Sequence, residues 1–313
     1  MLPRCSVAMR VLVLMASGIS FAGDSATPTS LAFKATEPGF YAFDTGLFRG
    51  KLKLDGKFMG LYPLMDAKSG QELTRPPGIF SPYRVFNTNK RYGNAARDWP
   101  ITTKLLADGA VEVHWPAATE HPVEMTSVYR WQAADTLDLS ITVKPQCDMP
   151  RFELFMSNYF TNRFLASVYV KPKDARRQPS FTPVNRPPDS QAKYVMFPRD
   201  DDAVSMIRDG RWKLGASPVD WAVESFMAAP MAFRRDAELG LTAVFMSPPG
   251  DCFAMSSPWN PDSPQGGGYR SLYQSFFGRD LKAGETARAR CRMVINRGLA
   301  DDQIVARYRE LVK

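Results

Sequence analysis

The side chains of this sequence that could carry out chemistry gather at two places, one of which follows a long apolar stretch. Tyr159, Asn162 and Arg163 lie at the end of that stretch, and His121 lies at the turn before it. Tyr and His can transfer protons, and the planar guanidinium of Arg binds carboxylates through paired hydrogen bonds. His121, Tyr159 and Arg163 are therefore the candidate catalytic residues. As alternatives, His121 could only cap its turn, and Tyr159 could be a core residue.

A second polar group occupies residues 83–99, where planar hydrogen-bond donors alternate with aromatic rings. Donors of this shape suit sugar hydroxyls, and aromatic rings suit the face of a pyranose. A solvated loop of the same composition is the alternative. The candidate substrate-binding residues are Arg84, Asn87, Arg91 and Tyr92 in this segment, with Asn162 and Trp259 from later parts of the chain.

The sequence contains no pattern typical of a metal or cofactor site. His114 and His121 are the only histidines, they do not form a His-x-x-x-His motif, and no two cysteines lie close together. These features give no support to a zinc site. A P-loop, a dinucleotide-binding fingerprint and a Ser nucleophile elbow are all missing as well. We therefore expect neither a metal nor a cofactor.

The elements that must position the candidate residues are β-strands. Apolar and polar residues alternate over 123–131 and over 137–143, and the alternation resumes at Phe152, beyond Pro145 and Pro150. A period of two indicates antiparallel strands that each bury one face. The stretch from 121 to 160 thus predicts a three-stranded meander, with Glu153, Phe155, Ser157 and Tyr159 on one face of its last strand.

Shorter patterns predict the remaining elements. Asp55-Gly56 and Asp108-Gly109 indicate hairpin turns, and the proline-rich residues 171–189 indicate a long surface loop. Residues 301–311 predict a short C-terminal helix that Asp301 can cap, with Ile304, Tyr308 and Leu311 on one face. Further strands are expected near 194–197, 204–208, 241–246, 272–277 and 287–295.

The order of these strands resembles the galactose mutarotase-like superfamily, whose members often carry a His-x-Tyr-Phe element after such a meander. Here the element is Ser157-Asn158-Tyr159-Phe160, and Leu281-Lys282-Ala283-Gly284-Glu285 is similar to the Leu-x-Pro-Gly-Glu turn of the superfamily. The resemblance implies an all-β fold, an antiparallel β-supersandwich with a short C-terminal helix. It also implies that the face bearing Tyr159 opens on a sugar-binding cleft.

Two departures from the superfamily pattern change the functional expectation. Ser157 occupies the histidine position, and a serine hydroxyl cannot act as a general acid near neutral pH. The glutamate that should act as the base would fall near residues 252–257, which contain none. We therefore expect a carbohydrate-binding or carbohydrate-active protein, whose chemistry, if it is an enzyme, would be that of a lyase or hydrolase on an acidic polysaccharide. The alternative is a non-catalytic glycan-binding or structural module.

The N-terminus predicts export. Arg4 and Arg10 precede the apolar residues 11–19, and Ser20-Phe21-Ala22 forms a small-x-small cleavage signature. The apolar run is too short to span a membrane, and no later segment is long enough. We expect a signal peptide over residues 1–22, a single domain over residues 23–313 and a secreted or periplasmic location.

Composition limits the partners. The chain has 313 residues with 25 Pro and 21 Gly, which favours many turns and few long helices. Its net charge of +8 is compatible with an anionic polysaccharide as partner, and solubility or adhesion to anionic cell-surface polymers are the simpler explanations of that charge. Nucleic acid is not expected, because the basic residues are dispersed. Beyond the predicted signal peptide, Cys147, Cys252 and Cys291 allow at most one disulfide, whose pairing stays open.

Overall fold

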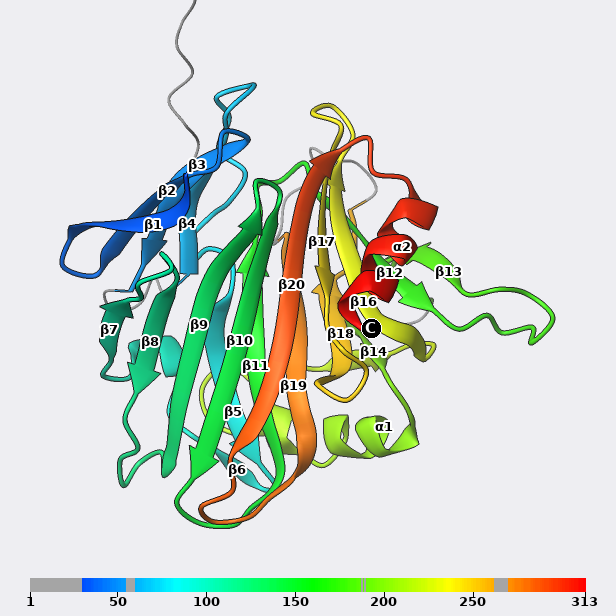
Figure 1. The fold of residues 1–313 in the computed structure, drawn as a ribbon. Helices are drawn as coiled ribbons and strands as arrows, with labels where there is room; N and C mark the ends of the chain where they lie inside the picture. Colours follow the sequence, from blue (N-terminus) through cyan, green and yellow to red (C-terminus); the bar gives the residue numbers. More distant parts are fainter. Residues whose placement is uncertain (1–29, 55–59, 187, 189, 262–269) are drawn as a thin grey trace, which may run out of the picture.

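The structure is a computed structural model that describes residues 30–54, 60–186, 188, 190–261 and 270–313. The predicted signal peptide and the Asp55-Gly56 turn lie outside these residues. The described residues form three β-sheets and a few short helices, with the two larger sheets facing each other (Figure 1). The smallest sheet has four strands in sequential order, namely β1 (Ser30–Glu37), β2 (Phe40–Asp44), β3 (Phe48–Lys53) and β4 (Gly60–Asp66).

The nine-stranded sheet is antiparallel throughout and contains the first two strands of the predicted meander. Its strands, in spatial order, are β13 (Ser180–Pro183), β12 (Leu165–Val170), β16 (Met227–Asp236), β17 (Leu241–Met246), β20 (Ala287–Arg297), β10 (Thr136–Pro145), β9 (Val123–Ala133), β8 (Val111–Trp115) and β7 (Thr102–Leu105). The third strand of the meander crosses to the other large sheet, so the two sheets are linked directly at residues 145–149.

The seven-stranded sheet carries the predicted site strand in its interior. Its strands, in spatial order, are β15 (Trp221–Val223), β14 (Tyr194–Pro198), β18 (Cys252–Pro258), β19 (Ser271–Leu281), β11 (Met149–Tyr159), β5 (Ser81–Asn87) and β6 (Lys90–Arg91). Neighbouring strands are antiparallel except β14 and β15, which are parallel. The helical segments are η1 (Ala96–Asp98), α1 (Asp201–Ile207), η2 (Arg211–Lys213) and α2 (Asp301–Leu311).

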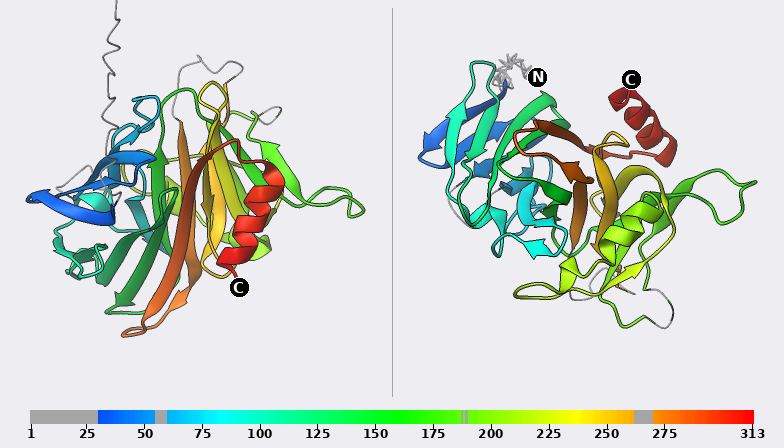
Figure 2. Two further views of the ribbon diagram at one scale, coloured as in Figure 1. Left: turned by 45° about the horizontal axis from the view of Figure 1, so that its top comes forward. Right: turned by 90° about the horizontal axis from the view of Figure 1, so that it is seen from below.

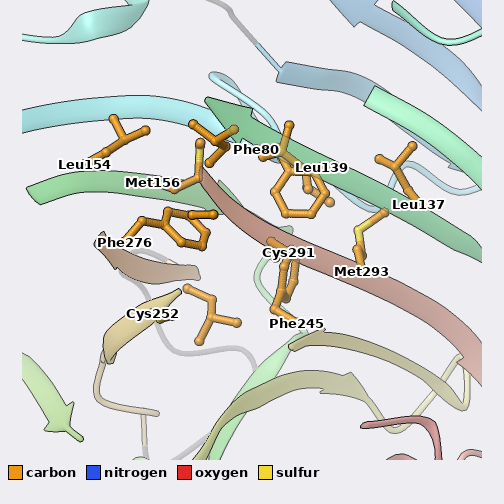
Figure 3. Packing of buried hydrophobic residues seen from close by; sticks show 14 of the residues in the cluster. Phe80, Leu137, Leu139, Leu154, Met156, Phe245, Cys252, Phe276, Cys291 and Met293 are labelled. Carbon is orange, nitrogen blue, oxygen red and sulfur yellow. The ribbon is translucent and has the colours of Figure 1, made fainter. Parts of the chain in front are cut away.

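The main core lies between the two large sheets (Figure 3). Because every second residue of a strand points inward, Leu137 and Leu139 of β10 are fully buried, as is Leu154 of β11. Phe245 of β17 meets Phe80 edge to face, with 5.6 Å between ring centroids. Each such side chain contributes about 1.5–3 kcal/mol of burial free energy, so the alternating strands account for most of the stability.

Each large sheet also has an outer face covered by a helix. On the nine-stranded sheet, Ile304 and Tyr308 of α2 pack against β16, β17 and β20. On the seven-stranded sheet, α1 and η2 pack against Phe86 and Phe155. Figure 2 shows α1 and α2 on different sides of the molecule. The sandwich therefore presents two covered outer faces, and the face that carries Phe155 is the one predicted to hold the site.

Three local predictions need correction. Residues 204–208 were predicted to form a strand, but they lie in and just after α1, because the Asp200 carboxylate caps this helix by accepting the Ala203 N–H at 2.9 Å. The proline-rich segment 171–189 is not wholly a loop, since β13 pairs with β12 within it. The C-terminal helix is confirmed, but Asp301 lies in its first turn and is not the N-cap. No helix within the described residues is long and apolar enough to cross a bilayer.

Candidate functional site

The outer face of the seven-stranded sheet contains a cavity of about 540 Å³, which we call the aromatic cavity. Strands β5, β11, β14, β15 and β19 supply its floor, and η1, η2 and the loop 214–219 supply its walls. Its basic residues are Arg84, Arg97 and Lys193. Its aromatic residues are Tyr83, Phe155, Tyr159, Tyr194, Trp212, Trp221 and Tyr273. The cavity thus combines several ring faces with positive charge.

A β-bulge in β5 turns two consecutive residues toward this cavity. Arg84 pairs with Phe155, whereas the next residue of β11, Met156, pairs with Pro82, so Tyr83 is an extra residue on β5. Neighbouring residues in a regular strand point to opposite faces, and a bulge breaks that rule. Tyr83 and Arg84 can therefore both line the cavity.

Arg84 is buried, with 2% of its surface exposed, yet most of its hydrogen-bonding capacity is unused. Its Nη2 donates to the Ser217 carbonyl at 2.8 Å, while its Nε and Nη1 have no hydrogen-bond partner among the described residues. The guanidinium also lies 5.0 Å from the ring centroid of Tyr83 and 5.2 Å from that of Trp212. A buried charge without a counterion costs several kcal/mol. This arrangement is typical of a site that receives an anion.

Further buried hydrogen-bond donors around the aromatic cavity also lack an acceptor among the described residues. The Nη1 atom of Arg97 and the indole N–H groups of Trp212 and Trp221 are buried without a partner in the described part of the chain. Arg97 also lies over the ring of Tyr83, 4.6 Å from its centroid. No Asp or Glu is among the described residues that line the cavity. The described wall therefore offers hydrogen-bond donors and positive charge without a carboxylate to neutralise them.

The phenol of Tyr83 is electrostatically unusual. Burial alone would raise the pKa of this hydroxyl above its ordinary value of 10.0. The hydrogen bond from Arg84 and the charges of Arg84, Arg97 and Arg91 outweigh burial and lower the pKa of Tyr83. A phenol of lowered pKa ionises more readily and can accept a proton. Tyr83 is thus a candidate proton acceptor, which the sequence did not suggest.

The pKa of Tyr159 is raised, in contrast to that of Tyr83. Tyr159 lies at the end of β11, half-buried, on the same face as Phe155, as the alternation predicted. Burial raises the pKa of Tyr159, and the charge of Arg97 and a hydrogen bond with Tyr273 offset this only in part. Its hydroxyl therefore stays protonated near neutral pH and can act as a donor.

Buried ion pairs hold the cavity walls in place. Arg211 of η2 is fully buried, and its Nη1 donates to the Glu153 carboxylate of β11 at 3.0 Å. Its Nη2 donates to Asp209 at 2.8 Å. These bonds fix η2 against the sheet, so that Trp212 meets Phe155 with 4.7 Å between ring centroids. Glu153 and Arg211 therefore position the cavity wall and do not line the cavity.

Arg91 supports the loop 214–219, which follows η2. Its Nη1 donates to the Leu214 carbonyl at 3.1 Å and to the Ala216 carbonyl at 2.6 Å. These bonds fix the loop that presents Ser217 to Arg84. Arg91, a predicted substrate-binding residue, is not among the residues that line the aromatic cavity, and its observed bonds position the loop.

Two other predicted binding residues of the segment 83–99, Asn87 and Tyr92, do not lie in the aromatic cavity with Arg84. Asn87 and Tyr92 are both buried and bond to each other, with 2.8 Å between the Asn87 Nδ2 and the Tyr92 hydroxyl oxygen. Neither lines the aromatic cavity. The predicted binding segment therefore does not act as one unit. The start of β5 lines the aromatic cavity, whereas the turn end of the hairpin of β5 and β6 does not.

The structure does not bring His121 or Arg163 to the cavity either. The His121 ring stacks on Trp99, with ring centroids 3.9 Å apart and planes at 6°. Arg163 pairs with Asp236 at 2.9 Å and with Glu238 at 3.1 Å. One side chain is occupied by stacking and the other by two carboxylates, so the predicted catalytic trio with Tyr159 is not assembled.

Asn162 and Trp259 also lie away from the cavity. The Asn162 carbonyl accepts a hydrogen bond from the Arg270 Nε at 2.6 Å. Trp259 packs against the main core, and the guanidinium of Arg186 lies 5.4 Å from its ring centroid. Of the nine predicted site residues, Arg84 and Tyr159 line the aromatic cavity.

The structure also shows the surroundings of Ser157, the residue at the position where the superfamily pattern has a histidine. Ser157 is fully buried in β11, and its hydroxyl donates to the Ser81 carbonyl at 2.9 Å. Residues 252–257, where a glutamate was expected, form β18 two strands away from β11. Neither position carries a group that could transfer a proton to a sugar ring.

The fold is an all-β sandwich with a short C-terminal helix, as predicted. The sequence matches no protein-family model, and it matches no curated protein. Solved structures are nevertheless similar in fold. The Slr1438 protein of Synechocystis sp. PCC 6803 has a TM-score of 0.52 and 12% identity, covering 86% of this chain and 99% of that chain.

Two further structures are similar at lower scores. A putative aldose 1-epimerase from Escherichia coli K12 has a TM-score of 0.48 and 11% identity, over 82% of this chain and 99% of that chain. The heparan sulfate lyase HepC of Pedobacter heparinus has a TM-score of 0.44 and 9% identity, over 85% of this chain and 37% of that chain. At such identities the likeness concerns the fold alone.

Proposed function

We propose that this protein is exported and binds an anionic carbohydrate, a uronate-bearing saccharide, in the aromatic cavity. The observation that carries the proposal is Arg84, a buried guanidinium whose Nε and Nη1 have no partner in the described residues. A uronate carboxylate would supply the missing counterion and accept from these donors. Charge-assisted bonds of this kind are about twice as strong as neutral ones, which makes the carboxylate the main recognition element.

The aromatic rings support a carbohydrate over a simple inorganic anion. Tyr159, Tyr194 and Trp221 surround the charge with ring faces on which a pyranose can stack. The free indole N–H groups can donate to sugar hydroxyls. Small-molecule sites typically combine an apolar, aromatic lining with a few fixed polar groups. The aromatic cavity has this combination.

Paired ligands test the proposal by calorimetric titration. An oligouronate should bind more tightly than the same oligosaccharide with its carboxyl groups reduced to alcohols. Arg84→Gln should weaken uronate binding by roughly 10- to 150-fold, corresponding to about 1.5–3 kcal/mol for a hydrogen bond to a charged group. Arg288→Gln, which removes an exposed arginine of β20, is the matched control. Equal affinity for the two ligands, or unchanged binding by Arg84→Gln, would overturn the proposal.

Export is supported by residues 1–22 alone, whose composition is that of a signal peptide. Expression of the full chain in a bacterial host, followed by mass measurement of the periplasmic or secreted protein, tests it. A mature chain beginning near Gly23 is expected, whereas an uncleaved chain in the cytoplasm would contradict export.

Tyr83 favours a second candidate function, β-elimination on the bound uronate. In such a step Tyr83, as the phenolate, takes the proton from the carbon next to the carboxylate, and Arg84 offsets the charge that develops on the carboxylate. The electron pair forms the new carbon–carbon double bond while the glycosidic bond breaks. The leaving oxygen takes a proton from Tyr159. Every proton and electron pair is thus accounted for without a further reactant.

Absorbance of the unsaturated product tests the elimination. Wild-type protein should generate it from a uronate polymer, and Tyr83→Phe should abolish it while retaining the binding measured by calorimetry. Binding without product across a broad panel of polymers would remove the lyase function and leave a glycan-binding module. No Asp or Glu pair lies among the described residues of the cavity wall, so no residue there favours hydrolysis.

A further inference from the structure

A second cavity of about 680 Å³ lies beside the hairpin of β12 and β13. Its lining includes four cations from residues 171–186, which we call the basic arm. These cations are Lys171, Lys173, Arg177 and Arg186. The acidic residues in the lining are Asp174 and Glu224, so positive charge predominates. Figure 1 shows the chain between β12 and β13 projecting from the body of the molecule.

Most of the arm's positive charge is not neutralised within the protein. Asp174 is already held by Arg176 through two hydrogen bonds, each of 3.1 Å. Lys173 and Arg177 are exposed, and their side chains form no ion pair with any described residue. Several cations therefore surround a space large enough for a sugar unit and attract anions to it.

The two cavities lie at opposite ends of the same pair of strands. Tyr194 at the start of β14 and Trp221 at the start of β15 line the aromatic cavity. Phe197 near the end of β14 and Glu224 just after β15 line the cavity of the basic arm. Along each strand the two lining residues, Tyr194 and Phe197 or Trp221 and Glu224, are three residues apart, which corresponds to about 10 Å. Residues three apart in a strand point to opposite faces, and Phe197 belongs to the main core whereas Tyr194 packs with the outer cluster. A ligand that reaches both cavities would therefore pass around β15, which is the edge strand of its sheet.

We propose that the basic arm forms a second subsite, which binds an anionic group further along the same polysaccharide chain. This inference rests on the proposed function of the aromatic cavity. A saccharide held by Arg84 would continue over the edge strand β15 and place a carboxylate or sulfate between Lys173 and Arg177. The protein therefore recognises a long polyanion at two points, one buried and one exposed.

The length of the ligand tests this subsite by calorimetric titration. Wild-type protein should bind uronate oligomers more tightly as their length increases, until both cavities are spanned. The double variant Lys173→Gln and Arg177→Gln should lose most of that gain, roughly tenfold for two exposed contacts, and should bind the shortest oligomer unchanged. Lys104→Gln with Arg288→Gln removes the same charge elsewhere and should behave as wild type.

The outcomes separate the two proposals. Short oligomers that bind without any gain from length, or a gain that survives in the arm variant, would overturn the second subsite and leave the aromatic cavity intact. An equal loss in the control pair would also overturn the subsite, because net charge alone would then explain the effect. Wild-type protein that binds no uronate of any length would overturn both.

Discussion

The two outer faces of the sandwich are covered in the same way but lined with different chemistry. Beneath α2, the nine-stranded sheet contributes Met231, Val244 and Met246, and the helix closes this face with Ile304. Beneath η2, the seven-stranded sheet contributes aromatic rings and the guanidinium of Arg84. Within the described residues, the second face has several partnerless buried indole and guanidinium donors, whereas the first has one partnerless buried donor, the Tyr308 hydroxyl.

This difference is the one that the proposed function requires, with one face that serves stability and one that binds a ligand. Aliphatic contacts gain free energy by leaving water, and they need no external partner. Buried donors without acceptors cost free energy unless a ligand supplies the acceptor. Since proteins are only marginally stable, a group of such donors in one cavity indicates that a ligand completes it.

The largest effect is expected at the ion pair that joins η2 to the second face. Glu153→Ala leaves Arg211 without its β11 partner in a fully buried position, so the variant should lose about 3–5 kcal/mol of unfolding free energy in urea. The partly exposed pair between Asp138 and Arg292 is the control, and Asp138→Ala should cost at most about 1 kcal/mol. Equal losses for the two variants would contradict the positioning role of Glu153.

A somewhat smaller effect is expected on the sealed face. Ile304→Ala leaves a cavity beneath α2 and should cost about 2–5 kcal/mol in the same urea experiment. Uronate affinity should not change at temperatures where the variant is folded, because α2 lies on the other sheet. A loss of affinity in the folded variant would show that the two faces are coupled and would break the division between them.

A modest effect is expected from a single donor of the cavity. Trp221→Phe keeps an aromatic ring but removes the free indole N–H, so uronate binding should weaken by about 2- to 10-fold. Trp131 also has a buried indole N–H with no partner among the described residues, but it belongs to the main core. Trp131→Phe should therefore leave calorimetric affinity unchanged, and a similar loss in both variants would contradict the assignment.

The smallest effect concerns the titration of Tyr83. Because its pKa is lowered in the folded state, the folded protein releases this proton at lower pH than the unfolded chain does. The resulting stabilisation is present above the unfolded value near 10.0 and is lost as pH falls through the lowered pKa. Phenolate absorbance of wild type minus Tyr83→Phe should show this ionisation, and Arg97→Gln should move it upward. An unchanged titration would argue against Arg97 as a cause.

Much of the fold could be predicted from the sequence, because strand alternation is a local property. The meander of β9, β10 and β11 was predicted within a few residues of its observed bounds. The prediction of a strand at residues 204–208 was wrong because Asp200 caps a helix there, and this cap stabilises the helix more than the weak apolar alternation favours a strand. Local signals compete over short segments, and there the cap outweighed the apolar alternation.

The site was predicted only in part, because it is assembled from distant segments. Arg84 and Tyr159 were predicted, but Trp212 and Trp221 reach them through the strand order of the sheet and the pairing of Arg211 with Glu153. No spacing in the sequence reveals that order. Residues 194–221 contain four aromatic residues, Tyr194, Phe197, Trp212 and Trp221, which is close to the 12% of the whole chain, so composition did not indicate them either.

A crystal structure with a short uronate oligosaccharide tests the central claim most directly. A ligand carboxylate is expected within hydrogen-bond distance of the Arg84 Nε or Nη1, with a sugar ring against the aromatic wall. Binding at another surface, with both Arg84 nitrogens still lacking an acceptor, would contradict the account.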